Sequence, residues 1–191
     1  MAFEHPLSKK SPIAAKAGEI QGKISALEAD LKALRQGAAE TAKDYRFADG
    51  NGTVTLSGLF GDKDELVLVH NMGADCPYCT MWADGYSGVT GYVEDRAAFV
   101  VASPDAPAEQ RKTAKSRGWK FRMVSSEGNS FFGDMGFEDA DGKPFPGVST
   151  FRKRGDGSIE HLASAAFGPG DKFCSVFSFF DLLPEKETVE A

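Results

Sequence analysis

One stretch of the sequence constrains the fold more than any other: an apolar strand that leads through a short loop into the start of a helix. Residues 65–71 have a Leu-Val-Leu-Val centre, the near-continuous apolar run of a strand buried on both faces. Pro77 suits a first helical position, because its missing N–H is not needed there. A strand, a short loop and a helix open a β-α-β unit, so this stretch predicts an α/β sheet.

The alternation of strands and helices continues along the chain. Further strands are expected at 53–56, 97–102 and 121–125. Helices are expected from 77 into the nineties, from 106 to 117 and from 171 to 183. Asp105 is expected to cap the second of these helices, and Gly118 to end it. Residues 148–153 and 159–163 flank a glycine-containing turn and are expected to form a hairpin. We therefore expect a mixed central sheet with an antiparallel edge, flanked by helices.

The N-terminal segment has a different pattern. Ser11 can cap a helix that ends at Gly37, and apolar residues recur at alternating spacings of four and three, at Ile13, Ala17, Ile20, Ile24, Leu27, Leu31 and Leu34. We divide the chain into a helical extension, 1–43, and a domain, 44–191. The apolar stripe could dock on the chain's own body or pair with a second copy in a homodimer.

Composition excludes several classes of function. The net charge of −6 argues against a nucleic-acid partner, which requires a basic surface. No run reaches the roughly 18 apolar residues that cross a bilayer, and residues 1–11 lack the apolar stretch of a secretory signal. Three cysteines do not make a disulfide-stapled secreted scaffold. A cytoplasmic protein without membrane association is expected.

Cys76 and Cys79 are expected at the start of a helix, a position that favours the thiolate form of a cysteine. Unpaired amides and the positive end of the helix dipole stabilise a negative sulfur, and the thiolate is the nucleophile of disulfide exchange. Redox chemistry is the leading interpretation, and a metal site or two unreactive thiols are the alternatives. Zinc usually needs four ligands, and only Cys174 and three histidines remain, without a second paired motif. No cofactor is therefore expected.

Several motifs resemble known redox families. Cys76-Pro77-Tyr78-Cys79 is identical to the active-site tetrapeptide of many glutaredoxins, and residues 47–58 and 132–137 are similar to the opening strands and a mid-domain helix of peroxiredoxins. The combination most closely resembles a peroxiredoxin-like bacterial family of unknown function, whose pattern is matched by His70, Met72, Cys76, Cys79, Trp82-Ala83-Asp84 and Gly118-Trp119. This resemblance implies a thioredoxin-like fold.

Three positions depart from these relatives. Gly73 stands three residues before Cys76, where a peroxiredoxin has Thr or Ser, and Ser149 stands where it has Arg. Ser149 also takes the place of the cis-proline that faces the dithiol in thioredoxins, so we expect its hydroxyl beside the two cysteines. Asp75 places a carboxylate next to Cys76 and opposes its ionisation. The sequence thus predicts an altered redox site.

Other residues have two interpretations each. His70 is either a hydrogen-bonded core histidine or a proton shuttle for the dithiol, and Trp82 either lines a pocket or packs in the core. Pro77 and Tyr78 support the site from within the motif. His5 and His161 are interpreted as structural or exposed. The remaining aromatic and thiol side chains are assigned to the core: Trp119, Phe173, Cys174, Phe177, Phe179 and Phe180.

The leading function is thiol-disulfide exchange, in which Cys76 attacks a disulfide and Cys79 resolves the mixed disulfide. Its partners would be a disulfide-containing substrate and an external thiol reductant, since no nucleotide-binding fingerprint is present. A thiol peroxidase of peroxiredoxin-like type, and a non-catalytic binding or assembly module, are the alternatives.

Overall fold

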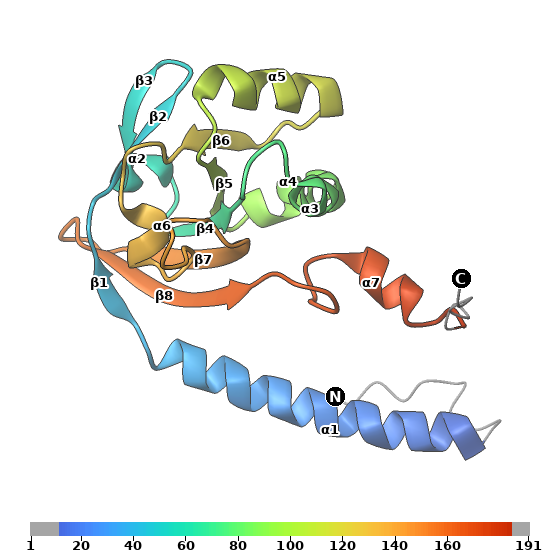
Figure 1. Cartoon of the computed structure of the whole chain (residues 1–191). Coiled ribbons are helices and arrows are strands. Elements are labelled where there is room, and N and C mark those ends of the chain that lie inside the picture. Colours follow the sequence, from blue (N-terminus) through green and yellow to red (C-terminus); the bar gives the residue numbers. More distant parts are fainter. Residues whose placement is uncertain (1–11, 185–191) are drawn as a thin grey trace. The chain divides into compact units, whose positions relative to one another are not determined.

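The computed structural model describes residues 12–184 and divides between Ala39 and Glu40 into two compact units (Figure 1). The strands are β1 (Glu40–Ala42), β2 (Arg46–Asp49), β3 (Gly52–Thr55), β4 (Glu65–His70), β5 (Ala98–Ser103), β6 (Arg122–Ser125), β7 (Gly147–Lys153) and β8 (Ile159–Ala166). The helices are α1 (Pro12–Gln36), α2 (Leu56–Leu59), α3 (Pro77–Ser87), α4 (Thr90–Glu94), α5 (Pro107–Arg117), α6 (Phe131–Asp134) and α7 (Ser175–Phe180). The predictions for His5 and Ser11 lie outside the described residues.

The first unit contains α1, the long helix that the apolar stripe predicts. It ends at Gln36, just before the expected stop at Gly37. The predicted pair of Glu19 and Lys23 forms, with Lys23 Nζ 2.8 Å from Glu19 Oε1. Both side chains are largely exposed, so this pair contributes little stability.

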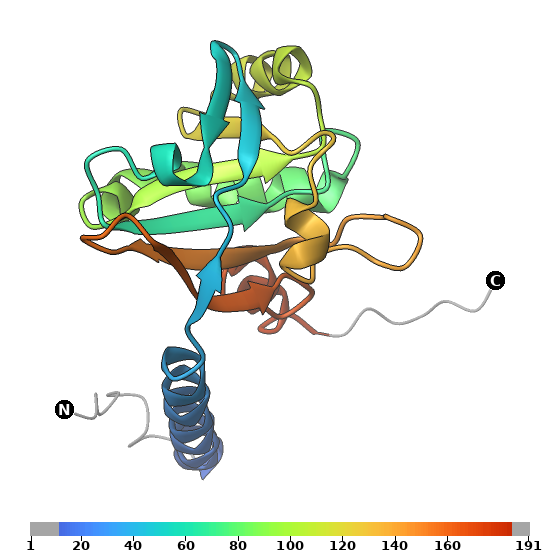
Figure 2. The ribbon, with the colours of Figure 1, turned by 90° about the vertical axis from the view of Figure 1, so that its left-hand side faces the viewer.

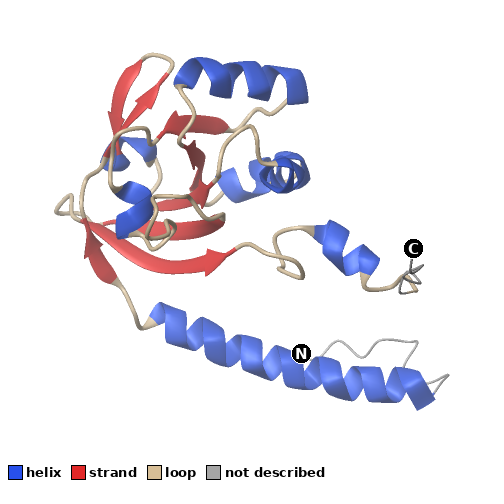
Figure 3. Ribbon diagram, viewed as in Figure 1, coloured by secondary structure: helices blue, strands red, loops and turns tan. Residues whose placement is uncertain are grey.

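The second unit is built on one eight-stranded sheet in the order β1-β8-β7-β4-β5-β6-β2-β3 (Figure 3). The central strands β4, β5 and β6 are parallel, and β7 joins β4 antiparallel. The β7–β8 hairpin forms as predicted, and Arg154 donates its amide to Ser158 across the turn at 2.8 Å. The expected mixed sheet with an antiparallel edge is confirmed.

The two faces of the sheet have separate apolar cores, with α2 and α6 on one face and α3, α4 and α5 on the other (Figures 1 and 2). Leu66 and Leu68 of β4 point into the first core, together with phenylalanines of α6. Val69 points into the second, together with Trp82 of α3. Because side chains alternate along a strand, β4 contributes to both cores, which explains its near-continuous apolar sequence.

Some predicted elements differ from the structure. The helix from residue 77 is interrupted, because α3 ends at Ser87 and α4 starts only at Thr90. The predicted helix 171–183 shortens to α7, and the prediction that Phe179 and Phe180 belong to the core is wrong, since they are 66% and 61% exposed. The prediction for Phe173 is wrong as well, at 44% exposure. Only the first turn of α7, with Val176 and Phe177, packs against the second core.

Two further differences concern the edges of elements. β1, which pairs with β8, is three residues long, too short for a strand alternation to be visible in the sequence. Asp105 does not cap α5: the cap position is Ala106, without a side-chain hydrogen bond, whereas Gly118 ends the helix as predicted with φ of 73°. Within residues 12–184, no helix is both long and apolar enough to cross a membrane.

Candidate functional site: a dithiol at the start of α3

A tightly bonded loop joins β4 to α3 and positions the two cysteines. Asn71 donates its amide to the carbonyl of Ala102 at 2.8 Å, and its side-chain oxygen accepts the amide of Gly73 at 2.8 Å. Cys76 in turn donates its amide to the Gly73 carbonyl at 3.2 Å. The backbone at Gly73 has φ of 113°, a conformation that a residue with a Cβ rarely adopts. The loop therefore holds the dithiol in a defined place.

Cys76 is the N-cap residue of α3. Its sulfur accepts the amide of Cys79 at 3.2 Å, the hydrogen bond that a Ser or Asp oxygen makes at an ordinary helix cap. Pro77 occupies the first helical position as predicted. The Cys76 side chain is partly exposed, so an external disulfide can approach its sulfur. An amide donor and a helix start thus both face a sulfur that solvent reaches.

Cys79 lies one turn later and is buried, with 2% exposure. Its sulfur accepts the amide of Met72 at 3.4 Å. Burial raises the pKa of the Cys79 thiol to about 12, with contributions from its hydrogen bond to Cys76 and from the charge of Asp105. Both cysteines are free thiols. The pair therefore combines a reachable outer sulfur with an inner sulfur that stays protonated.

Asp105, predicted as a helix cap, instead contacts the dithiol loop. It follows β5, and its carboxylate accepts the amide of Ala74 at 3.0 Å and the hydroxyl of Ser103 at 3.0 Å. Gln110 of α5 donates to the same hydroxyl at 2.9 Å. The carboxyl ends of adjacent parallel strands meet at one sheet edge, and β4 and β5 are such a pair. That rule is the signal that could have placed Asp105 beside the dithiol loop.

The prediction that Ser149 faces the dithiol is wrong. In the β4–β7 pairing Gly147 stands opposite His70, and Ser149 stands opposite Leu68, farther from the dithiol loop. Its hydroxyl lies 2.8 Å from His70 Nε2 and is fully buried. The match of Ser149 to the cis-proline position is therefore wrong.

His70 lies on the same face of β4 as Leu66 and Leu68, because side chains alternate along a strand, and it therefore points away from α3. Its ring stacks on Phe137 and Phe131, which belong to the core on the other face of the sheet. Burial lowers the pKa of His70 to about 3, and the nearby His161 adds to the shift. Hydrogen bonds of 2.8 Å each join Ser149 to Ser164 and Ser164 to His161. Of the two interpretations, the structure supports a hydrogen-bonded core histidine.

The other predicted support residues lie around the dithiol at different depths. The side chains of Asp75 and Tyr78 are exposed, and Tyr78 is 62% exposed with its ring 6.5 Å from that of Trp82. Trp82 is buried, and its indole N–H donates to Asp171 at 2.9 Å. Cys174 is buried in the same core, as predicted. Trp82 thus belongs to the core and also ties α3 to the C-terminal segment.

The Trp-Ala-Asp and Gly-Trp motifs meet in the structure. Asp84 accepts hydrogen bonds from the indole N–H of Trp119, at 2.8 Å, and from the guanidinium of Arg117. The Arg117 bond holds the pKa of the Asp84 carboxyl below its usual range. This contact joins α3 to the end of α5, so it fixes the helix that carries the dithiol.

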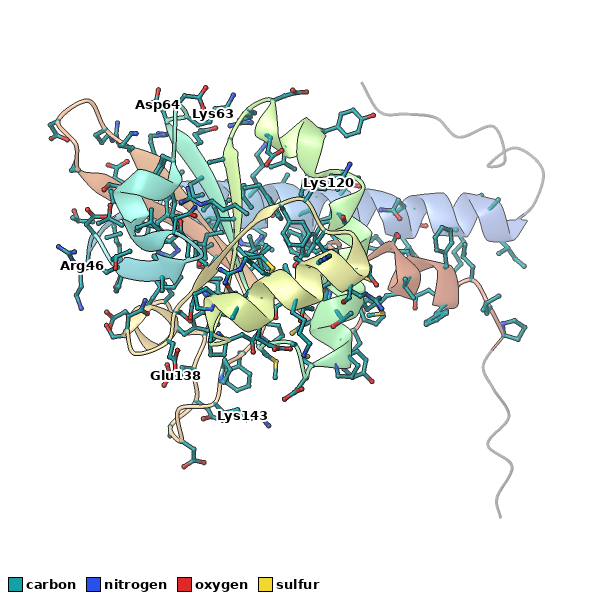
Figure 4. The ribbon with its side chains drawn as sticks, turned by 90° about the horizontal axis from the view of Figure 1, so that it is seen from above. Arg46, Lys63, Asp64, Lys120, Glu138 and Lys143 are labelled. Carbon is teal, nitrogen blue, oxygen red and sulfur yellow. The ribbon has the colours of Figure 1, made fainter. Side chains whose placement is uncertain are left out.

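A charged groove lies at the opposite end of β4 from the dithiol. Lys63 and Asp64, at one edge of the domain in Figure 4, line it together with Arg96 and Arg152. Glu65 accepts hydrogen bonds from both of these arginines. One carboxylate thus pairs with two of the arginines that line the groove. Among residues 12–184, no group of three or more His, Cys, Asp and Glu side chains is gathered as a metal site would require.

Comparison with protein families identifies one match. The model of the family described as "Bacterial protein of unknown function (DUF899)" matches residues 16–189. A search of curated proteins found no match.

Solved structures similar to this chain include several peroxiredoxins. Peroxidoxin BcpB from Mycobacterium tuberculosis is 26% identical with a TM-score of 0.54, over 67% of this chain and 84% of that one. The 1-Cys peroxiredoxin of Plasmodium falciparum is 16% identical with a TM-score of 0.58, over 75% and 96%. Reduced Prx3 from Vibrio vulnificus is 14% identical with a TM-score of 0.56, over 75% and 96%. The domain therefore has the thioredoxin-like fold of these proteins.

Proposed function

Because the chain belongs to the DUF899 family, whose description assigns no reaction, we propose its function from the site: Cys76 and Cys79 carry out thiol-disulfide exchange. The observation that carries this proposal is the difference between the two sulfurs. Cys76 is partly exposed and accepts an amide hydrogen bond at a helix start, whereas Cys79 is buried and protonated beneath it.

In the first step, the Cys76 thiolate attacks one sulfur of a substrate disulfide. A new S–S bond joins Cys76 to that sulfur, and the other substrate sulfur leaves as a thiolate that takes up a proton. The Cys79 amide, 3.2 Å from the Cys76 sulfur, stabilises the attacking thiolate. The exposed ring of Tyr78 offers an apolar contact to an incoming substrate next to the reacting sulfur.

In the second step, Cys79 releases the substrate. Its thiol loses a proton, its sulfur bonds to Cys76, and the remaining substrate sulfur leaves as a thiol. The substrate disulfide has then gained two electrons, and the protein holds a Cys76–Cys79 disulfide. An external dithiol or glutathione-type thiol must return two electrons to complete the cycle. The raised pKa of Cys79 makes this second step slow near neutral pH unless a base assists it.

Gly73 favours disulfide exchange over peroxide chemistry. A Cβ built at this position would lie 2.9 Å from Asp105 Oδ1, and the backbone φ of 113° disfavours side chains. A hydroxyl-bearing residue, such as peroxiredoxins have three residues before the reactive cysteine, therefore does not fit here. The site thus lacks one usual donor for a bound peroxide.

A thiol peroxidase is the second candidate, and the observation that favours it is the fold shared with BcpB and other peroxiredoxins. In that reaction the Cys76 thiolate attacks a peroxide oxygen, an alcohol or water leaves, and Cys76 becomes a sulfenic acid. Cys79 then condenses with the sulfenic acid and releases water. Both candidates end on the same intramolecular disulfide, so only the first substrate distinguishes them.

The test compares the two substrates on the same reduced protein. Turnover of a small disulfide, hydroxyethyl disulfide with glutathione as reductant, is measured next to consumption of hydrogen peroxide and of cumene hydroperoxide. We expect disulfide turnover that Cys76→Ser abolishes. Cys79→Ser should accumulate a mixed disulfide on Cys76, visible as an added mass.

Cys174→Ser is the matched control, because this buried thiol lies outside the dithiol, and it should keep full turnover. Faster consumption of peroxide than of disulfide would replace the proposal by the peroxidase. A protein inert to both substrates would instead support a non-catalytic binding module.

A further inference from the structure

The apolar seam of α1 consists of the seven residues at spacings of four and three: Ile13, Ala17, Ile20, Ile24, Leu27, Leu31 and Leu34. In heptad notation, Ala17, Ile24 and Leu31 take the a positions, and the other four take the d positions. The larger members are exposed, for example Leu27 at 68% and Leu34 at 73%. A seam of this kind on a helix of 25 residues matches the core of a two-stranded coiled coil.

The residues that flank the seam have opposite charges at matching positions. Lys23 and Asp30 precede a positions and are therefore g residues, whereas Glu28 and Arg35 follow d positions and are e residues. In a parallel two-stranded coil, each g residue faces the e residue five positions later on the other helix. Lys23 then faces Glu28 of the second copy, and Asp30 faces Arg35. By symmetry each of these attractive pairs occurs twice.

From the seam and these charges we propose that α1 pairs with α1 of a second copy of this chain as a parallel two-stranded coiled coil. The two glycines of α1 fit this arrangement. Gly18 and Gly22 take the outward b and f positions, and nothing lies within 4 Å of a Cβ built at either one. Glycines weaken an isolated helix, so pairing with a second copy would stabilise α1.

An antiparallel pair of the same helices matches these charges less well. In that arrangement g residues face g residues, and e residues face e residues. With the seams fully overlapped, Lys23 would still find Asp30, but Glu28 would face the uncharged Gln21, and Arg35 would face Ala14. Of the two arrangements, only the parallel one pairs all four of these charged residues.

The test uses the full chain and reverses one pair. The mass of the wild-type protein is measured by sedimentation over the micromolar concentration range, and a dimer is expected. Asp30→Arg should weaken dimerisation about ten- to thirtyfold, because two attractive pairs become repulsive. Adding Arg35→Asp to the same chain should restore the dimer, since each pair is attractive again. Ala29→Arg is the control, because it introduces an arginine at an outward f position, away from the proposed interface, and should have little effect.

The outcomes separate the possibilities. A mass of one chain at every concentration overturns the proposal, as does a dimer that Asp30→Arg leaves unchanged. A double variant that stays as weak as Asp30→Arg also overturns it, since in the antiparallel arrangement the arginine introduced at position 30 would meet Lys23. Thermal melting of each variant checks that the second unit, described from Glu40 to residue 184, is unaffected.

Discussion

The buried histidine on the face opposite the dithiol should make the stability of this domain depend strongly on pH. His70 has no exposed surface, and its ring lies between Phe137 and Phe131, with centroids at 4.0 Å and 5.1 Å. Its Nε2 bonds to Ser149, and its Nδ1 has no hydrogen-bond partner. Nothing there compensates a positive charge, which is why burial lowers the pKa of His70 to about 3.

The size of the effect follows from linkage. The pKa is lower in the folded chain, about 3, than the ordinary 6.5 of the unfolded chain, so the unfolded state binds a proton that the folded state does not. The resulting stability is present above pH 6.5 and is lost as the pH falls below it. Between pH 7 and pH 5 the loss is about 2 kcal/mol from this residue alone. For a domain of this size, that corresponds to a melting temperature about 4–8 °C lower.

The measurement is urea unfolding at pH 7 and at pH 5, for the wild type and for His70→Phe. Phenylalanine keeps a ring among the phenylalanines but cannot bind a proton. The fall in unfolding free energy between the two pH values should therefore shrink by about 2 kcal/mol in the variant. His161→Gln is the comparison, and it should remove a smaller part, because His161 is only half-buried; burial lowers its pKa as well, and its charge adds to the lowering of the His70 pKa. Equal pH dependence in the wild type and His70→Phe would refute this reasoning.

Three further predictions concern the dithiol and its supports. Timed alkylation of the reduced protein, read by mass spectrometry, should label Cys76 first, because Cys174 is 2% exposed; faster labelling of Cys174 would remove the basis of the site assignment. Gly73→Ala should lower the free energy of unfolding by about 2–3 kcal/mol in urea, because its Cβ meets the Asp105 carboxylate in a strained backbone; no change would mean that the loop yields easily. Asp171→Ala should lower the free energy of unfolding by about 2–3 kcal/mol in the same assay, because one indole N–H and three backbone amides lose their acceptor. An unchanged free energy of unfolding would contradict this role of Asp171.

The sheet could be predicted from the sequence because its signals are local. The apolar run of β4, the glycine that ends α5 and the turn between β7 and β8 each mark an element within a few residues. The heptad spacing likewise predicted α1 to within a residue or two. What these signals lack is the pairing between strands, and the error at Ser149 arose there.

Ser149 shows the consequence of an unknown register. Matching it to a cis-proline placed its side chain at the dithiol, whereas the pairing of Gly147 with His70 puts it on the other face. Strand side chains alternate, so a shift of an odd number of residues reverses the face of every side chain. Local sequence does not fix which residues of β4 and β7 stand opposite one another.

Asp105 was misassigned for a related reason. By sequence alone, an acidic residue just before a predicted helix is a cap. In the structure its carboxylate instead accepts the amide of Ala74 in the dithiol loop, 31 residues earlier in the chain. The preference of a helix start for Asp is worth about 1 kcal/mol, and a loop amide with no other acceptor competes with it on equal terms.

The central sheet separates the candidate dithiol site from the buried hydrogen-bonded histidine. The cysteines and Asp105 lie at the end of β4, next to α3, whereas the hydrogen-bonded chain from His70 through Ser149 and Ser164 lies within the sheet, toward its other face. His70 is only six residues before Cys76, yet its imidazole is neutral and faces phenylalanine rings. In the proposed exchange, His70 therefore does not take up the proton that leaves Cys79. The pH dependence of exchange should accordingly follow Cys79, and the pH dependence of folding should follow His70. Because the two groups lie on different faces of the sheet, His70→Phe should change the pH dependence of folding and leave the pH dependence of exchange unchanged.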